Sequence, residues 1–364
     1  MLRWLLELPK TFDVGIVGAG VAGSVCAEAL GRAGVSVAIF DNSHPRDKPC
    51  GGLVENRLVE EFRVPETVLQ NEIRFFLAER FGLKVKLRVD PPAFLVSRRD
   101  FDHYLFRKAL EHESVVHFNE RVARVSKIGR LWRLETCRGN NTEAKVIVGA
   151  DGCPSVVRNS VCRPIPREFL ATTVGYDFTC SRSYIEEAFP KNTVEAYFSR
   201  KYVRNGGFVW FFPKGDRVNV GIGSLDTGKK LAHALNTFIA SHPSGKRLKS
   251  LSGRPYAHLV PAVWREQFFD SPCAGEDWAV LGDAAAHVNP INGAGIYYAM
   301  KDGVLCASAF LHGDLASYDE LWRREYGDEL YYGARMFLRY YGAAGPILWM
   351  QYLLSGLIFG VGLL

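Results

Sequence analysis

The glycine-rich segment near the start of the chain is the first place where residue type and spacing indicate chemistry. Gly18, Gly20 and Gly23 form a GxGxxG pattern between an apolar, β-rich run at 12–17 and an alanine-rich helical pattern at 24–32. In this context Gly18 permits a tight turn, Gly20 lets the backbone approach a pyrophosphate, and Gly23 allows a helix to pack closely on a strand. The helix N-terminus stabilises the anion. The segment therefore predicts a dinucleotide-binding turn.

An acidic residue follows at the position that such a turn requires. Residues 35–40 predict a second buried strand, and Asp41 stands at its carboxyl end, 18 positions beyond Gly23. Strand, helix and strand together predict a βαβ unit, in which Asp41 accepts a hydrogen bond from a ribose hydroxyl.

Two more turns combine glycine with a carboxylate. Asp151 and Gly152 follow a buried strand predicted at 145–149, and Gly282 and Asp283 follow the apolar run 278–281. These two turns are not expected in a dehydrogenase that binds only NAD, whereas Asp283 at a strand end can bond a ribityl hydroxyl of a flavin. The two turns therefore indicate FAD rather than NAD as the bound cofactor.

An amide-rich turn precedes the apolar helix predicted at 296–310. Its N–H groups can lie near the flavin pyrimidine, and the helix N-terminus stabilises the negative charge that a reduced flavin carries there. The candidate flavin-binding residues of this stretch are Pro290, Gly293, Ala294, Gly295 and Ile296.

These motifs together resemble the flavoprotein group that includes para-hydroxybenzoate hydroxylase. Arg98 fits that group's arginine, which lies against the cofactor, and the alternative is a solvated surface charge. The resemblance implies an α/β chain, α+β overall, with a discontinuous Rossmann-like FAD-binding domain. We expect that domain to contain an inserted antiparallel sheet for the substrate.

Within this group the sequence is similar to the geranylgeranyl reductase family over residues 12–310. The similarity rests on Pro49-Cys50-Gly51-Gly52, on the aromatic run 208–213 with 218–223, and on the block from Gly282 to Pro290. It implies an FAD-dependent enzyme that hydrogenates isolated C=C bonds of polyprenyl chains on lipids, quinones or prenyl diphosphates. It also implies that the flavin receives its electrons from NADPH or from another reductant, such as an electron-donor protein.

Two departures from the family pattern concern the substrate. Phe208 stands where the family's aromatic motif commonly has Tyr, so any role of that hydroxyl is absent. The chain is also short after the Gly282 block, which leaves the length of a substrate tunnel open.

Cys50 is the candidate catalytic residue, and with Gly51 and Gly52 we expect it beside the flavin ring. Its thiol could donate a proton, contact the flavin or only fill space, because a cysteine often behaves as a small buried hydrophobe. An isolated alkene accepts hydride poorly, so its reduction needs a proton donor and a dry cavity.

The aromatic run at 208–213 supplies the candidate substrate-binding residues Phe208, Trp210 and Phe212. Alternate side chains of a strand lie on opposite faces, so one set is expected to face the cavity. Sheet core is the alternative role for these rings.

An oxygen-using enzyme is the rival functional class, because flavin hydroxylases and halogenases share the fold. Halogenases carry a tryptophan-rich motif near the place of the run 208–213, but only Trp210 appears here. The loop around Cys50 is foreign to both of these families, so we favour a reductase.

Composition excludes several other classes. With 364 residues, 48% of them hydrophobic and 23% charged, the chain fits a globular protein of about two domains. Its eight cysteines form no CxxC pattern, which indicates a reducing compartment and no metal site. The net charge of +6 forms no basic tract with interleaved aromatics, so nucleic acid is not an expected partner.

The domain organisation follows from where the motifs fall. We expect a discontinuous FAD-binding domain that spans 1–60, 95–165 and 265–312. The substrate domain is expected at 61–94 and 166–264, and a C-terminal helical segment at 313–364.

The C-terminal segment carries no charged residue from Tyr340 onward, and its last apolar run, 347–364, is 18 residues long. As a helix this run would extend about 27 Å, just short of the ~30 Å hydrocarbon core of a bilayer. Arg335, Arg339, Tyr340, Tyr341 and Trp349 resemble interfacial anchors. We expect a peripheral protein on the cytoplasmic membrane face, and the alternative is a helix that closes the substrate cavity.

Overall fold

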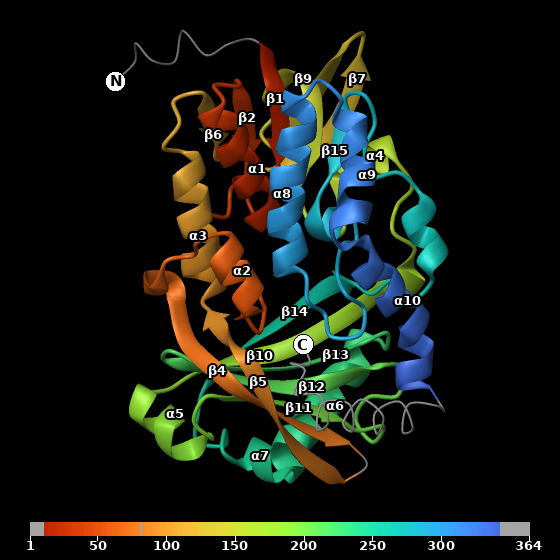
Figure 1. Cartoon of the computed structure of the whole chain (residues 1–364). Coiled ribbons are helices and arrows are strands. Elements are labelled where there is room, and N and C mark those ends of the chain that lie inside the picture. The colour runs from red at the N-terminus through yellow and green to blue at the C-terminus, as the bar shows by residue number, and fades with distance from the viewer. Residues whose placement is uncertain (1–10, 81, 343–364) are drawn as a thin grey trace.

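The chain is organised around two β-sheets, which a computed structural model describes for residues 11–80 and 82–342 (Figure 1). The first sheet orders its strands β6-β2-β1-β9-β8-β7, with β15 beside β9. Its strands are β1 (Thr11–Val17), β2 (Val37–Phe40), β6 (Val115–Phe118), β7 (Val122–Ile128), β8 (Leu131–Thr136), β9 (Asn141–Gly149) and β15 (Trp278–Val280).

A Rossmann-like unit forms the centre of this sheet. Strand β1 pairs in parallel with β2 and β9, and α1 (Val21–Arg32) makes the crossover from β1 to β2. Helix α1 packs between α3 (Arg98–Ala109) and α8 (Ile296–Leu311), and these helices cover one face of the sheet (Figure 1). The sequences of these strands are continuous apolar runs because the strands are buried on both faces. The predicted βαβ unit is confirmed.

The second sheet crosses below the first domain and has eight strands in the order β14-β10-β13-β12-β11-β4-β5-β3. They are β3 (Leu53–Val54), β4 (Leu69–Arg80), β5 (Leu83–Val96), β10 (Leu170–Thr179), β11 (Thr193–Phe198), β12 (Gly207–Lys214), β13 (Arg217–Ser224) and β14 (Gly253–Pro261). One pair departs from the expected antiparallel pattern, because β4 and β11 are parallel. They come from separate stretches of chain, which no tight turn joins, so antiparallel pairing is not enforced between them.

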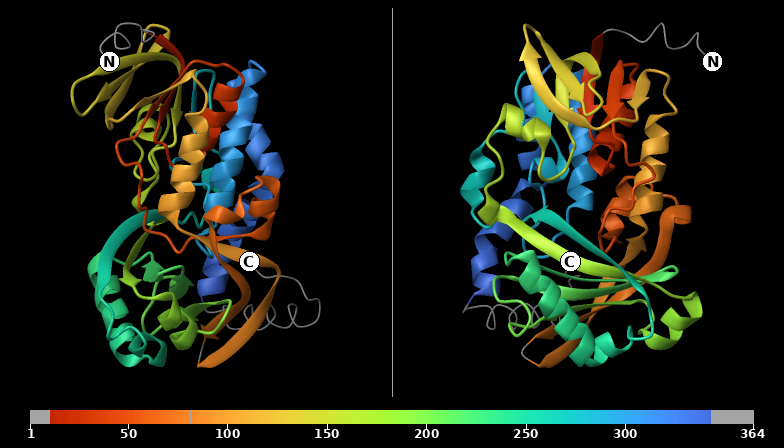
Figure 2. Two further views of the ribbon diagram at one scale, coloured as in Figure 1. Left: turned by 90° about the vertical axis from the view of Figure 1, so that its left-hand side faces the viewer. Right: turned by 180° about the vertical axis from the view of Figure 1, so that it is seen from behind.

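The two faces of the second sheet have different neighbours. Val209 and Phe211 of β12 pack with Leu235 and Phe238 of α6 (Gly228–Ser241), which lies under the sheet (Figure 2). The alternate residues of β12 lie on the opposite face, which is turned toward the first domain. The helices α5 (Arg182–Ala188) and α7 (Pro243–Lys246) also lie on the α6 side.

A long C-terminal helix joins the two halves. Helix α10 (Asp328–Tyr341) follows α9 (Tyr318–Trp322) and begins against the first domain, where Glu329 accepts two hydrogen bonds from Arg57 of α2 (Asn56–Glu61) at 2.6 and 2.8 Å. Its last turn reaches the second sheet, where the Tyr340 ring lies 6.1 Å from that of Phe198. The helix therefore spans from the first domain to one end of the second sheet (Figure 1).

The predicted membrane-contacting run at 347–364 lies outside the described residues. Within 11–80 and 82–342, no helix combines the length and apolar character needed to cross a bilayer.

A buried polar network holds the turn that follows β15. Asp302 of α8 is fully buried and accepts the Gly282 N–H at 2.7 Å. Its carboxylate also lies 2.9 Å from Nδ1 of His287 and accepts the hydroxyl of Tyr326. Because all of these groups are excluded from water, Asp302 ties the turn, α8 and the segment before α10 into one unit.

Replacing the carboxylate of Asp302 should therefore destabilise the fold. Asp302→Asn is expected to lower the free energy of unfolding by about 3 kcal/mol, because the side-chain amide nitrogen cannot accept the buried hydrogen bonds that the carboxylate accepts. Denaturant titration measures this, with the exposed Glu113→Gln as a control expected within about 0.5 kcal/mol of wild type. Equal effects of the two substitutions would contradict the role given to the network.

Candidate functional site

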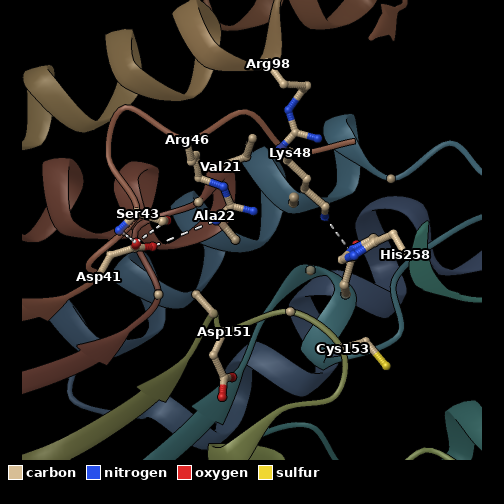
Figure 3. A pocket seen from close by; sticks show the side chains of 18 of the residues that line it. Val21, Ala22, Asp41, Ser43, Arg46, Lys48, Arg98, Asp151, Cys153 and His258 are labelled. Atoms are coloured by element: carbon tan, nitrogen blue, oxygen red, sulfur yellow. Dashed lines mark hydrogen bonds and ion pairs between the residues drawn. The ribbon is translucent and has the colours of Figure 1, made fainter. Parts of the chain in front are cut away.

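A cavity of about 610 Å³ lies between the carboxyl ends of β1, β2 and β9 and the face of β14 (Figure 3). Its walls come from the turns after those strands, the loop 41–50, the start of α8 and two residues of β14. The volume falls in the range of sites for small ligands and cofactors. A doubly wound sheet binds its ligand at this edge of the strands.

The glycines of the first turn have the geometry that their spacing predicts. Gly18 has a φ of +97°, and a Cβ there would lie 2.4 Å from the Ala150 carbonyl oxygen. A Cβ at Gly23 would lie 1.9 Å from the carbonyl oxygen of Gly18. Gly20 lines the cavity, so its missing side chain leaves the backbone open to a ligand.

Two helix N-termini point into this cavity without side-chain caps. Gly20 begins α1 and Gly295 begins α8, and neither helix has a capping hydrogen bond or an acidic residue in its first turn. By contrast, Ser97 caps α3. The uncapped first-turn N–H groups carry partial positive charge and lack intrahelical partners. They fit an anionic group at α1 and an electron-rich ring edge at α8, as FAD would present.

Asp41 lines the cavity directly after β2. It accepts the N–H of Ala19 at 2.9 Å and that of Ser43 at 2.8 Å. Burial opposes its ionisation, but the hydrogen bonds from Ser43 and Ala19 and the charge of Arg46 hold the pKa of Asp41 below its ordinary value. The carboxylate is therefore ionised and can accept a hydroxyl hydrogen bond.

An ion pair crosses the other end of the cavity. Nζ of Lys48 lies 2.7 Å from Oδ2 of Asp283 (Figure 3). Burial raises the pKa of Asp283, but Lys48 outweighs this effect and leaves that pKa below its ordinary value. The sequence pattern identified Asp283, whereas nothing in it indicated Lys48 as the partner.

His258 of β14 lines the same region and was missed by sequence reasoning. Its Nε2 is buried and has no hydrogen-bond partner among the residues that the structure describes. Burial and the nearby charge of Lys48 lower the pKa of His258 to about 4, so the imidazole is neutral at neutral pH. A buried, unpaired polar atom in a cavity wall fits a site that receives a polar ligand.

Arg98 is buried rather than a solvated surface charge. Only 6% of it is exposed, and its Nε and NH2 donate to Asp102 at 2.7 and 2.8 Å. Burial disfavours the charge, but Asp102 and Cys50 raise the pKa of Arg98 above its ordinary value. Arg98 therefore presents a fixed positive charge at the cavity wall.

Asp151 differs from the other predicted carboxylates, because its side chain serves the fold. It accepts hydrogen bonds from Ser155 Oγ at 2.5 Å and from the Val156 N–H at 2.6 Å, at the start of α4 (Val156–Val161). Burial raises its pKa. Asp151 and Gly152 both line the cavity, but the carboxylate of Asp151 is engaged by α4.

The loop around Cys50 is fixed from the second sheet. Nζ of Lys214 donates to the carbonyl oxygens of Cys50 and Gly51 at 3.0 and 3.1 Å. The Phe212 ring occupies the place of a Gly51 side chain, since a Cβ there would lie 2.2 Å from the ring. Gly52 has a φ of +78° and lies against the backbone of Val96. Phe212 of the second sheet therefore packs directly against this loop.

Lys214 was also missed by sequence reasoning, since it is the last residue of an apolar strand. It is 4% exposed, and burial lowers its pKa, an effect that Cys50 and Asp177 oppose. A niche of about 10 Å³ separates these groups, which is about the room of one water molecule. It is lined by Asp47, Lys48, Cys50, Ser97, Arg98, Asp177, Lys214 and Arg217.

The aromatic side chains of β12 form a row on the face toward the first domain. Phe208 and Trp210 have ring centroids 5.9 Å apart, and Trp210 donates its indole N–H to Asn219 at 2.7 Å. Beyond Phe208 the row continues to Phe198 at 5.2 Å and from there to Tyr340. These rings stand beside the cavity and do not line it.

The structure brings most of the predicted cofactor residues to one cavity. Those that line it are Gly18, Gly20, Asp41, Cys50, Arg98, Asp151, Gly152, Gly282, Asp283, Gly293, Gly295 and Ile296. The predicted residues outside its walls are Gly23, Gly51, Gly52, Pro290, Ala294, Phe208, Trp210 and Phe212. Pro290 instead lies against α10, where a Cβ at Gly333 would be 3.0 Å from it.

Comparison with protein families and relatives agrees with this geometry. Residues 177–253 match the geranylgeranyl reductase catalytic domain, and residues 16–69 match an NAD(P)-binding Rossmann-like domain. A menaquinone reductase of Mycolicibacterium smegmatis is 31% identical over 85% of this chain and 79% of its own. A digeranylgeranylglycerophospholipid reductase of Methanocaldococcus jannaschii is 27% identical over 89% and 85%.

A solved structure shares the fold. The geranylgeranyl bacteriochlorophyll reductase-like protein of Thermoplasma acidophilum superposes with a TM-score of 0.74 over 89% of this chain and 86% of its own, at 19% sequence identity. The predicted fold class is confirmed. Taken with the identity to curated relatives, the comparisons show that the chain belongs to the geranylgeranyl reductase family of FAD-dependent oxidoreductases.

Proposed function

We propose that this protein is an FAD-dependent reductase that hydrogenates isolated C=C bonds of a polyprenyl chain. The proposal rests on the loop around Cys50, where the cavity and the second sheet meet. There the cavity with its two uncapped helix N-termini reaches a loop that the aromatic strand of the second sheet holds in place. A cofactor site and an aromatic strand thus meet at one loop.

In the proposed complex, a different group of the cavity binds each part of FAD. The N-terminus of α1 receives the diphosphate, and Asp41 accepts a hydroxyl of the adenosine ribose. Asp283 accepts a ribityl hydroxyl, and the N-terminus of α8 faces the pyrimidine edge of the ring. Bound FAD in its reduced form supplies a hydride equivalent to the substrate.

The proton is the part of the reaction that this chain must deliver. Saturating one C=C bond adds a hydride to one carbon and a proton to the other. In the proposal the Cys50 thiol gives up that proton and becomes a thiolate, beside the fixed charge of Arg98. A proton from solvent, relayed through the niche shared with Lys214, restores the thiol.

Positioning is the proposed role of Lys214 and Phe212. Two hydrogen bonds from Lys214 and the ring against Gly51 fix the loop backbone, so the Cys50 side chain has a defined place at the cavity wall. A catalytic group held by packing and hydrogen bonds needs less reorganisation during the reaction.

The substrate in this proposal is a polyprenyl chain attached to a polar head. Phe208, Trp210 and Phe212 offer it an apolar surface that excludes water from the reacting bond. The names of the two relatives support this class, since one is a reductase of a quinone and the other of a digeranylgeranyl phospholipid.

The electron donor is proposed to be NADPH or another reductant, such as an electron-donor protein. The sequence has no second GxGxxG after a strand, so NADPH would visit the flavin transiently rather than occupy a domain of its own. A substrate carried in lipid favours a peripheral position on the cytoplasmic face of the membrane.

Anaerobic incubation with a prenyl substrate tests the proposed reaction. Holoenzyme reduced with dithionite is expected to add mass in steps of two hydrogens to a prenyl quinone, a geranylgeranyl lipid or geranylgeranyl diphosphate, with reoxidation of the flavin. Mass spectrometry and flavin absorbance follow the two events. Substrate-stimulated oxygen consumption with hydroxylation or halogenation of an aromatic compound, and no hydrogen added to any prenyl chain, would establish the rival class instead.

Filling the space at Gly20 tests the cofactor site. Gly20→Val places a branched side chain beside Arg46, whose NH1 would be 3.1 Å from a Cβ, in the wall meant for the diphosphate. The variant should be folded and colourless, with FAD lost from the purified protein by absorbance near 450 nm. A yellow, FAD-loaded Gly20→Val variant would place the cofactor elsewhere.

Removing the thiol separates its chemistry from flavin binding. Cys50→Ala should keep the flavin spectrum and lower the rate of prenyl reduction about 100-fold or more, as expected for loss of a general acid. Cys180→Ala is the matched control, because Cys180 is also half-buried and lies outside the cavity. If the two variants reduce the substrate equally fast, Cys50 only fills space.

A further inference from the structure

One end of the molecule concentrates positive charge. Three segments meet there: 82–88 in the β4–β5 hairpin, 199–206 before β12, and 335–342 at the end of α10, together called the basic end below. Their contacts centre on Tyr340, whose carbonyl oxygen accepts a hydrogen bond from Arg80 at 2.8 Å and whose ring lies by Phe198. In Figure 1 the hairpin tip and the end of α10 lie at the same lower corner.

The three segments contain no Asp or Glu. Their basic residues are Lys84, Lys86, Arg88, Arg200, Lys201, Arg204, Arg335 and Arg339. Because the whole chain has a net charge of only +6, the rest of it is net negative. The positive field is therefore localised at this end, which orients the protein toward an anionic surface.

Neighbouring carboxylates neutralise only part of that charge. Lys84 pairs with Glu79, Arg88 with Asp90 and Arg335 with Glu266. Lys86, Arg200, Lys201, Arg204 and Arg339 are exposed and form no ion pair within the described residues. Five cations at one end thus remain available for an external partner.

Exposed apolar side chains accompany these cations. Leu83 at the hairpin tip is 63% exposed and Leu338 on the last turn of α10 is 56% exposed. Single exposed leucines are common on soluble surfaces. Exposed leucines in the same segments as the unpaired Lys86 and Arg339 are instead typical of elements that lie in the headgroup region of a membrane.

The basic end is also continuous with the proposed substrate surface. The aromatic row runs from Tyr340 through Phe198 and Phe208 to Trp210, with ring centroids 5.2 to 6.1 Å apart. On the same strand, Phe212 contacts the loop of Cys50. An apolar chain leaving a bilayer at this end would follow aromatic rings to the cavity.

We propose that the basic end docks the protein on the surface of an anionic bilayer. Leu83 and Leu338 enter the headgroup region, the unpaired cations contact lipid phosphates, and the prenyl chain passes along the aromatic row. The last step rests on the proposed function, whereas docking itself does not depend on it.

Vesicle flotation of the full-length holoenzyme tests the docking. Wild type should bind phosphatidylcholine vesicles that contain phosphatidylglycerol, bind pure phosphatidylcholine vesicles weakly, and dissociate as salt is raised. The triple variant Arg200→Gln, Lys201→Gln, Arg204→Gln should bind the anionic vesicles about 100-fold more weakly, at about 1 kcal/mol for each charge near the surface.

Matched controls come from the first domain, from the β7–β8 hairpin and from the turn that follows β8 (Figure 1). The triple variant Arg124→Gln, Arg130→Gln, Arg138→Gln loses the same charge from exposed positions and should bind like wild type. Ile128→Ser is the control for Leu83→Ser, because Ile128 is 43% exposed in that hairpin.

Several results would overturn the docking surface. The first is that both triple variants weaken vesicle binding equally, and the second is that wild type binds neutral and anionic vesicles equally well. The third is that the protein self-associates instead of binding vesicles. The fourth is that vesicle binding is lost only when residues 346–364 are removed. The proposed function is read out separately, because the variant with altered residues 200, 201 and 204 should reduce detergent-dispersed substrate at the wild-type rate. Failure of wild type in that detergent assay, with vesicle binding intact, counts against the function alone.

Discussion

The segment from Ser43 to Gly52 is held by both domains at once, and the shape of the site depends on that double attachment. Lys48 pairs with Asp283 of the first domain, while Asp47 pairs with Arg254 of the second sheet. Lys214 then binds the backbone at Cys50. Because the same loop forms a wall of the cavity, the positions of the two sheets set where the thiol stands relative to a bound cofactor.

The charges around this loop explain why it belongs to a functional site rather than to the core. Burying the Lys214 ammonium and the Arg98 guanidinium is costly, and a fold selected for stability alone would replace them with apolar groups. Asp102 offsets the cost at Arg98. At Lys214 the cost is only partly offset, which the lowered pKa of its amine reflects.

Sequence reasoning succeeded where local rules decide the structure. The parallel sheet and its glycine turn followed from periodicity and from the spacing of Gly18, Gly20 and Gly23. The sequence did not indicate features that depend on tertiary contacts. These are the parallel pairing of β4 with β11, the position of His258 in the cavity wall and that of Lys214 beside the Cys50 loop. Alternation on a strand says which residues share a face but not which loop that face will meet. For the same reason the sequence did not indicate that Phe212 packs against Gly51.

In the complex that we propose, the flavin ring ends at the Cys50 loop, between the N-terminus of α8 and the second sheet. A crystal structure of the complex with FAD tests it most directly. We expect the diphosphate on the first turn of α1, the pyrimidine edge at Gly295 and the Cys50 side chain in contact with the ring. A ring that lies outside the cavity, or one out of contact with Cys50, would contradict it.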